Sequence, residues 1–532
     1  MIARWSALHA AVAIVLLHVA VSPGFRAFGL YHWHDSQRCL QLVALSVVCL
    51  LLAASGDARS AVADATRRCL PGRIAWLAAA AGCFAVLAVA QAAAPRFAAL
   101  ELALLGTLCL CGLCVAAARL RGGDPVDAVL LSGIVLTAAV LALPFLVAWL
   151  AAMTSGLGLR PALLYQSGFS NVRFLGQFHT LAMPLLACAL LLPGLRRGYR
   201  WLLFALLTVT WVMAIGTATR ATWLAWSIGM LVVLPFAGRV ILPLLKVQAA
   251  AVAAGMALSW LLLEFLPRFA VGGLQNASGL ASVIGRFSDP LALSMRDIIW
   301  MRAVEVIAAH PWSGLGPMML ALDHNRIATH PHNALLQLAA EWGIPMTGLV
   351  VLVGACLAWR LLLALRVTCK PAGLPPAAPS PGQARRALLA CALCCSAAGA
   401  VVHSMVDGLL VMPHAQMACA LVAGWTVGLL FSQAPPAPAG SILPPNGSEA
   451  PTEPAPVPAW ITQAALAGWS LFALCAFVIG ALPEAFDLDA REHAYFDKYM
   501  GDETRKPRLW SQGWLFEDVP AELPLERRPV PR

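Results

Sequence analysis

Thirteen apolar runs of membrane-spanning length follow one another along the chain. They cover residues 7–23, 39–55, 74–94, 98–118, 126–152, 175–193, 201–216, 221–237, 240–265, 345–366, 387–405, 409–431 and 459–481. About 20 apolar residues in a helix suffice to cross the hydrocarbon core of a bilayer. In a bilayer every backbone N–H and C=O must be paired within the chain, which favours helices. The pattern therefore predicts an all-α polytopic membrane protein with about 12–13 transmembrane helices.

The polar stretches between these runs divide the chain into segments. We expect an N-terminal transmembrane bundle of about nine spans (1–265), a large loop carrying short helices (266–344), spans ten to twelve (345–432), a Pro-rich linker (433–458), a last span (459–481) and a tail (482–532). The linker composition is typical of disordered or polyproline-like chain. The tail carries charges of both signs and is expected to be partly ordered against the bundle.

Composition and charge support a membrane protein and set its orientation. Of 532 residues, 60% are hydrophobic and 12% are charged. Sixteen Lys and Arg residues lie in or beside the loops that follow even-numbered runs, whereas six lie in the opposite short loops. By the positive-inside rule the first set is cytoplasmic. The 266–344 loop and the tail are then extracytoplasmic. The basic residues are distributed over many loops and do not form one patch, so no nucleic-acid partner is expected.

The large loop contains a predicted helix that begins near Ser294. Ser294 and Asp297 have the spacing of a capping box, and Pro311 ends the helix. Arg296 and Trp300 lie on one face of it. This face would present a cation and an aromatic ring together.

A second, short helix follows a histidine-bearing turn. The sequence His330-Pro-His332-Asn333 precedes it, and Asn333 is a suitable N-cap. Gly343 and Pro345 predict its end. The two helices therefore frame one loop that holds His330 and His332.

Several arginines in or beside the extracytoplasmic loops suit an anionic ligand. A diphosphate can be neutralised by arginine forks or by a divalent metal held on carboxylates. The arginines are Arg220, Arg286, Arg296 and Arg302, whereas the Asp-x-Asp pattern is confined to Asp487 and Asp489. The sequence thus favours a metal-independent site. For Arg286 and Arg302, a side chain that merely reaches from the helix to the bilayer surface is an equal alternative.

The histidine turn allows more than one chemistry. The imidazole group accepts a proton near neutral pH, so His332 is a candidate general base, although a structural histidine is the alternative. A zinc site would use His324, His330 and His332 with Asp323, but no helical H-x-x-x-H pair is present. Glu341 would orient His332, pair with an arginine, or simply face solvent.

These motifs resemble those of a known family. The segment HPHNALLQLAAEWGIP is similar to the His-x-His-Asn…Glu-x-Gly signature of the O-antigen ligase and polymerase superfamily, preceded by HPWSGLG and by RATWLAW. HSMVDG and GQFHTLAMP resemble segments of the bacterial protein O-oligosaccharyltransferases of pilin glycosylation. In that branch a Glu followed by Tyr-Pro usually stands where this chain has Asp407 and Gly408. The resemblance spans about residues 165–415.

The resemblance implies an enzyme that transfers a glycan from undecaprenyl diphosphate to an acceptor hydroxyl at the periplasmic face of the bacterial inner membrane. His332 matches the essential histidine, Arg220 and Arg296 the diphosphate-binding arginines, and Glu341 the acidic residue after the histidine. Supporting residues are His330, Asn333, Trp300, His403, Asp407 and Gln177. No metal or other cofactor is implied.

Three acceptors fit this chemistry: the lipid A core, a pilin-like protein, or the growing glycan, the last being a polymerase activity. A transporter or flippase is the alternative of a different class, for which paired inverted repeats and mid-span charges would be expected. A non-catalytic scaffold would not require histidine and arginines gathered at one face.

Overall fold

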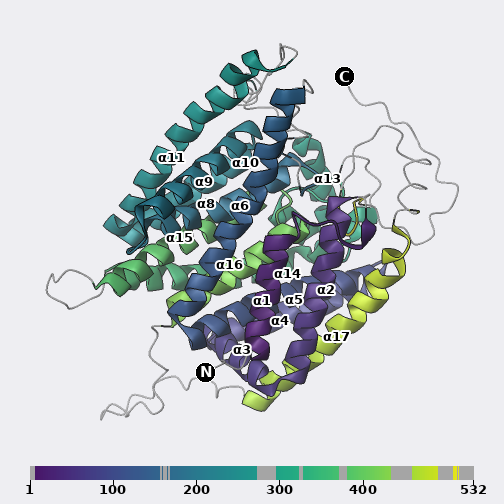
Figure 1. Cartoon of the computed structure of the whole chain (residues 1–532). Coiled ribbons are helices and arrows are strands. Elements are labelled where there is room, and N and C mark those ends of the chain that lie inside the picture. The colour runs from purple at the N-terminus through teal and green to yellow at the C-terminus, as the bar shows by residue number, and fades with distance from the viewer. Residues whose placement is uncertain are drawn as a thin grey trace, which may run out of the picture.

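The computed structural model describes residues 6–30, 32–155, 159, 164–165, 168–271, 285, 295–322, 328–370, 380–432, 458–488, 490, 507–511 and 513. These residues form helices and connecting turns, with no strand among them (Figure 1). Eleven helical stretches within them are long and apolar enough to cross a membrane. The predicted all-α polytopic fold is confirmed.

The longer helices run in chain order as follows: α1 (Ala7–Val21), α2 (Trp33–Ala54), α3 (Gly56–Cys69), α4 (Arg73–Ala90), α5 (Pro95–Gly122), α6 (Asp124–Ser155), α8 (Val172–Leu191), α9 (Arg197–Gly216), α10 (Arg220–Ala237), α11 (Leu242–Trp260), α13 (Arg296–Ala309), α14 (Ala334–Cys369), α15 (Pro381–Ser404), α16 (Pro413–Phe431) and α17 (Ala459–Ala485). Each of the thirteen predicted runs corresponds to a helix. Eleven candidate spans are counted instead of thirteen for two reasons. Helix α1, with 15 residues, is shorter than the 18 residues required of a span, and α10 and α11 are counted together as one stretch of 50 residues.

Two helix boundaries differ from the prediction. Helix α13 starts at Arg296, one residue late, after Met295 in a left-handed conformation (φ 62°) without a side-chain cap. Ser294 lies outside the described residues. The short helix that starts after Asn333 continues directly into the next span as α14, with non-helical backbone only at Gly343 (φ 82°). Gly343 therefore marks a kink that separates residues 334–342 from the long membrane-spanning part.

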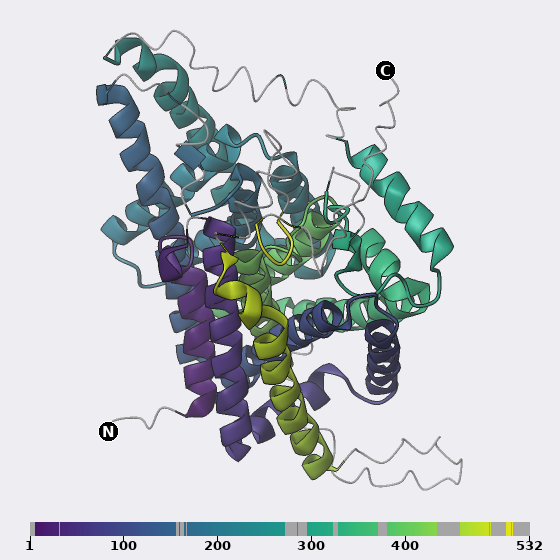
Figure 2. The ribbon, with the colours of Figure 1, turned by 90° about the vertical axis from the view of Figure 1, so that its right-hand side faces the viewer.

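Large apolar side chains remain exposed all round the bundle, as expected where lipid rather than water is the solvent. Examples are Leu17, Trp76, Leu143, Leu202, Leu231 and Leu471. Figure 2, turned by 90°, shows α1 and α2 side by side with α17 along the same flank. The short yellow ribbon of residues 507–511 lies near the ends of α2 and α17 at which the functional site is built.

Small residues allow α5 and α16 to approach closely. A Cβ atom added at Gly424 would lie 2.0 Å from the carbonyl oxygen of Gly112, and one added at Gly428 would lie 2.8 Å from that of Ala116. Close backbone approach over small residues is a main source of helix association in membranes. This contact holds α16, and the turn before it, against the N-terminal half of the bundle.

We expect Gly424→Ala to lower stability by about 1–3 kcal/mol, because its methyl group forces the two backbones apart. Thermal unfolding of the detergent-solubilised protein measures the effect. Gly82→Ala on α4 is the matched control, since an added Cβ there meets nothing within 4 Å. Equal unfolding midpoints for the two variants would show that the α5–α16 contact does not limit stability.

Candidate active site

The turn that carries His332 is held from both sides. The indole Nε1 of Trp300 on α13 donates to the Pro331 carbonyl at 2.9 Å. The side chain of Asn333 accepts from the Leu336 amide at 3.0 Å and caps α14, as predicted. Between them His332 has a left-handed backbone (φ 53°), which is uncommon for a residue with a side chain. Such strain persists only where neighbours enforce it, and it is frequent at functional sites.

Asp407 lies at the centre of the site and brings together residues from four segments. Its Oδ1 lies 3.4 Å from His332 Nδ1, and its Oδ2 lies 3.5 Å from His403 Nε2. The Gln177 amide donates to Oδ2 at 3.4 Å, and the Gly408 amide donates to Oδ1 at 2.8 Å. The structure therefore joins the predicted residues His332, His403, Asp407 and Gln177 in one cluster.

The cluster has a buried end and an open end. His403 is completely buried, and its Nδ1 lies 2.8 Å from the Thr180 hydroxyl on α8. The Asp407 side chain is 2% exposed, whereas that of His332 is 22% exposed. His332 is thus the member that an external reactant can reach, and Asp407 fixes the orientation of its ring. A carboxylate on Nδ1 leaves Nε2 as the nitrogen available to accept a proton.

The environment of Asp407 keeps it ionised. Burial acts to raise its pKa, but the hydrogen bonds and charges of His332 and His403 together outweigh burial, so that the pKa of Asp407 lies well below its usual range. A carboxylate that stays negative at neutral pH stabilises a neighbouring imidazolium.

His330 is a buried neighbour of His332. Their ring centroids lie 4.3 Å apart, and neither ring nitrogen of His330 has a hydrogen-bond partner among the described residues. Burial, then the charges of His332 and Arg508, hold the pKa of His330 well below its usual range, so it is neutral. A Cβ at Gly408 would lie 2.3 Å from His330 Nε2. The glycine that departs from the family pattern therefore makes room for this ring.

Arginines stand at the starts of three helices, and one of them, Arg296, interacts with Asp407 of this cluster. Arg173 is the second residue of α8, Arg220 is the first of α10 and Arg296 is the first of α13. Burial lowers the pKa of Arg296, the charge of Asp407 raises it, and those of Arg173 and Arg220 lower it further, with a net lowering. Arg296 is thus close enough to interact with each of the other three charged groups. Sequence analysis placed Arg173 only among the loop residues, because its proximity to Arg220 and Arg296 is a tertiary feature.

Helices α8 and α10 are in close contact near their N-termini, which carry Arg173 and Arg220. The Thr222 hydroxyl donates to the Gly176 carbonyl at 3.0 Å, and a Cβ at Gly176 would lie 2.4 Å from that hydroxyl oxygen. The lack of a side chain at Gly176 therefore allows the start of α10, which begins with Arg220, to contact the N-terminal part of α8, which carries Arg173 and Gln177.

Of the remaining predicted residues, Arg302 lies on an exposed helix face and others are not among the described residues. Arg302 pairs with Glu305 at 2.9 Å on an exposed face of α13. Arg286, His324 and Asp489 fall outside the described residues. Within the part of the chain that the structure describes, no group of three or more His, Cys, Asp or Glu side chains is arranged to hold a metal ion.

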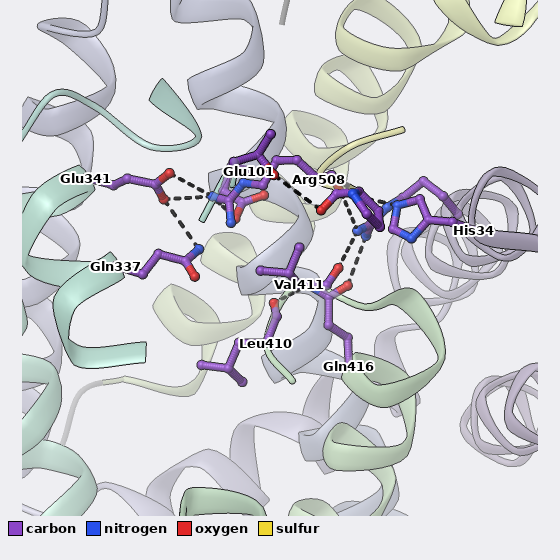
Figure 3. Close-up of polar contacts among 11 residues, drawn as sticks. His34, Glu101, Gln337, Glu341, Leu410, Val411, Gln416 and Arg508 are labelled. Atoms are coloured by element: carbon purple, nitrogen blue, oxygen red, sulfur yellow. Dashed lines mark hydrogen bonds and ion pairs between the residues drawn. The ribbon is translucent and has the colours of Figure 1, made fainter. Parts of the chain in front are cut away.

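Glu341 is fully buried and pairs with an arginine of the tail. Arg508 Nη2 lies 2.7 Å from Glu341 Oε2 and 3.0 Å from Oε1, and 3.2 Å from Glu101 Oε1 on α5 (Figure 3). The solvent-facing alternative for Glu341 is excluded, and the arginine-pairing alternative is observed. Sequence analysis missed Arg508. Its only local signal is the adjacent pair Leu509 and Trp510, apolar residues in a charged tail.

Comparison with known proteins agrees with the motifs. Residues 202–353 match the family model described as O-antigen ligase. This segment is similar to the O-antigen ligase family. The predicted superfamily resemblance is thereby confirmed. No curated protein matches the chain.

The matched segment contains only part of the cluster. Arg220, Arg296, His332 and Glu341 lie inside the matched segment. Gln177, His403, Asp407 and Arg508, together with Arg173, lie outside it and complete the site from other helices and from the tail.

Proposed function

We propose that the protein transfers a glycan from undecaprenyl diphosphate to an acceptor hydroxyl, without a metal, at the periplasmic face of the bacterial inner membrane. The acceptor oxygen forms a bond to the anomeric carbon as the bond to the diphosphate oxygen breaks. The acceptor proton passes to His332, and the polyprenyl diphosphate leaves. The family match supports a glycosyltransferase of the O-antigen ligase or polymerase type.

The observation that carries this proposal is the placement of Arg173, Arg220 and Arg296 in the first turns of three helices. A helix N-terminus bears a partial positive charge, so an arginine there is electrostatically unfavourable. Helix N-termini and arginine forks are both preferred ligands of phosphate groups. A diphosphate would relieve the repulsion among these cations, and it would be stabilised most when it leaves with increased charge.

The acid–base part of the site lies next to these cations. His332, oriented by Asp407, is suited to accept the acceptor proton, and Asp407 stabilises the imidazolium that forms. The hydroxyl would then be activated close to the bound diphosphate. A transporter would not require an oriented histidine at this position.

The acceptor defines the biological class. Transfer to lipid A core sugar makes the enzyme a ligase, transfer to a pilin-like Ser or Thr makes it a protein O-oligosaccharyltransferase, and transfer to a second lipid-linked glycan makes it a polymerase. Reconstitution of the purified protein in lipid vesicles with a polyprenyl-diphosphate-linked glycan and each acceptor in turn distinguishes these activities.

In this assay, with EDTA present throughout, we expect His332→Ala to reduce transfer at least a hundredfold while donor binding stays unchanged. The reason is that the arginines, not the histidine, hold the donor. His310→Ala, at the exposed C-terminal end of α13, is the control and should transfer at the wild-type rate. Normal transfer by His332→Ala would exclude the base role, and loss of all transfer in EDTA that Mg²⁺ restores would exclude metal independence.

Replacement of an arginine by lysine keeps the charge and removes the planar fork. If the guanidinium groups bind the diphosphate in a bidentate manner, Arg220→Lys and Arg296→Lys should each raise the activation free energy of transfer by on the order of 2 kcal/mol. This lowers kcat/KM roughly thirtyfold. Arg197→Lys is the matched control, since Arg197 is also the first residue of a helix, α9, but is exposed near the opposite ends of the helices. Wild-type kcat/KM in both site variants would remove these arginines from the donor site.

A further inference from the structure

Residues 507–511 form a short buried segment, here called the strap, that is inserted between helix ends near the site. All five residues, Pro507 to Ser511, are buried although the strap belongs to the polar C-terminal tail. Their partners are side chains of α2, α5, α14 and α17, which lie far apart in the sequence. The strap therefore joins the first and last parts of the chain to the segment that matches the O-antigen ligase family.

The strap is held by contacts that do not involve the Arg508 side chain. The Ser511 amide and hydroxyl both donate to the Asp35 carboxylate at 2.7 Å. The Trp510 indole donates to Glu484 at 2.6 Å. Arg38 donates to the carbonyls of Arg508 and Leu509 at 3.2 and 3.3 Å. These contacts anchor the strap backbone even when the side chain at position 508 is changed.

The Arg508 guanidinium neutralises Glu341. Its side chain is 1% exposed and that of Glu341 is 0% exposed. Figure 3 shows the guanidinium between Glu341 and Glu101, with Gln337 of α14 alongside. Removing one partner of a buried ion pair strongly destabilises the folded protein, because the other charge is left buried and uncompensated. Arg508 is thus the group that fixes Glu341 in its present place.

Glu341 in turn fixes the short helical segment that follows His332. This segment, residues 334–342, is capped by Asn333 at one end and separated from the rest of α14 by the kink at Gly343. The backbone carbonyl of Glu341 also accepts from the Gly316 amide at 2.9 Å. A displacement of Glu341 would therefore shift the segment that begins directly after His332.

The strap contacts the turn that carries the histidine directly, and it is linked through Arg38 to the turn that carries the carboxylate. The Thr329 hydroxyl donates to the Pro507 carbonyl at 3.4 Å, just before His330. Arg38 donates to the Val411 carbonyl at 2.6 Å, just after the Asp407 turn, and to Gln416 at 2.9 Å (Figure 3). The same cluster of polar contacts thus restrains both partners of the His332–Asp407 contact.

We propose that Arg508 is a positioning residue for glycan transfer: by pairing with Glu341 it holds residues 334–342, and with them His332, in register with Asp407. This inference rests on the proposed function. It predicts an effect on the chemical step and not on donor affinity, because the arginines that face the donor are on other elements. A displacement of about 1 Å in a reacting group costs on the order of a hundredfold in rate.

The test is steady-state transfer by the full-length Arg508→Ala variant with and without guanidinium ion. We expect kcat to fall at least tenfold with donor KM unchanged within twofold, and millimolar guanidinium chloride to restore much of the loss in a saturable manner. Ser511→Ala is the matched control, because it removes a strap contact without touching Glu341, and it should keep wild-type kcat and show no response to guanidinium.

The outcomes separate the hypotheses. Wild-type kcat in Arg508→Ala overturns the inference, as does a loss that guanidinium does not restore or that appears in donor KM. Should Arg508→Ala not be recovered folded, Arg508→Lys keeps the charge and should show a three- to tenfold lower kcat at unchanged donor KM, and wild-type kcat would again overturn the inference. Absence of transfer by the wild-type protein with all three acceptors would instead reject the proposed function.

Discussion

A charge buried in an apolar helical bundle requires a partner of opposite sign, and this constraint organises both ends of the protein. On the side of the predicted cytoplasmic loops, Arg119 lies 2.6 Å from Asp127, which also accepts from the Trp425 indole at 2.7 Å. At the other end, Arg508 pairs with Glu341, and Asp407 contacts two histidines. The desolvation of such groups is costly unless their contacts are complete. The pairs therefore determine which helix ends must come together.

The candidate active site is built around the second set of pairs. Asp407 draws together the starts of α8 and α14 and the end of α15, and the arginines at the starts of α8, α10 and α13 lie around it. The result is a carboxylate that contacts two histidines, with Arg296 close enough to interact with that carboxylate and with the other two arginines. The left-handed backbone at His332 shows that the turn is held in place by its neighbours rather than by its own preference.

The fold was largely predictable because the bilayer leaves the chain few alternatives. Apolar runs long enough to span a bilayer are expected to be helices. The start of α14 was predictable because Asn333 is a preferred N-cap residue. The His332 turn was predictable from its local motif. Glu341 was left with three alternatives, since its partner lies 167 residues away in the sequence. Arg508 and Arg173 were missed for the same reason: tertiary packing, not sequence spacing, brings them to the site.

The central claim is a single displacement in which an acceptor hydroxyl, deprotonated by His332, attacks the anomeric carbon as diphosphate leaves. The most direct measurement is the anomeric configuration of the new glycosidic bond, determined by NMR on the product of the reconstituted protein and a donor of known configuration. A single displacement predicts inversion, with one polyprenyl diphosphate released for each bond formed. Retention of configuration would contradict the account, because it requires a glycosyl–enzyme intermediate that this mechanism does not contain.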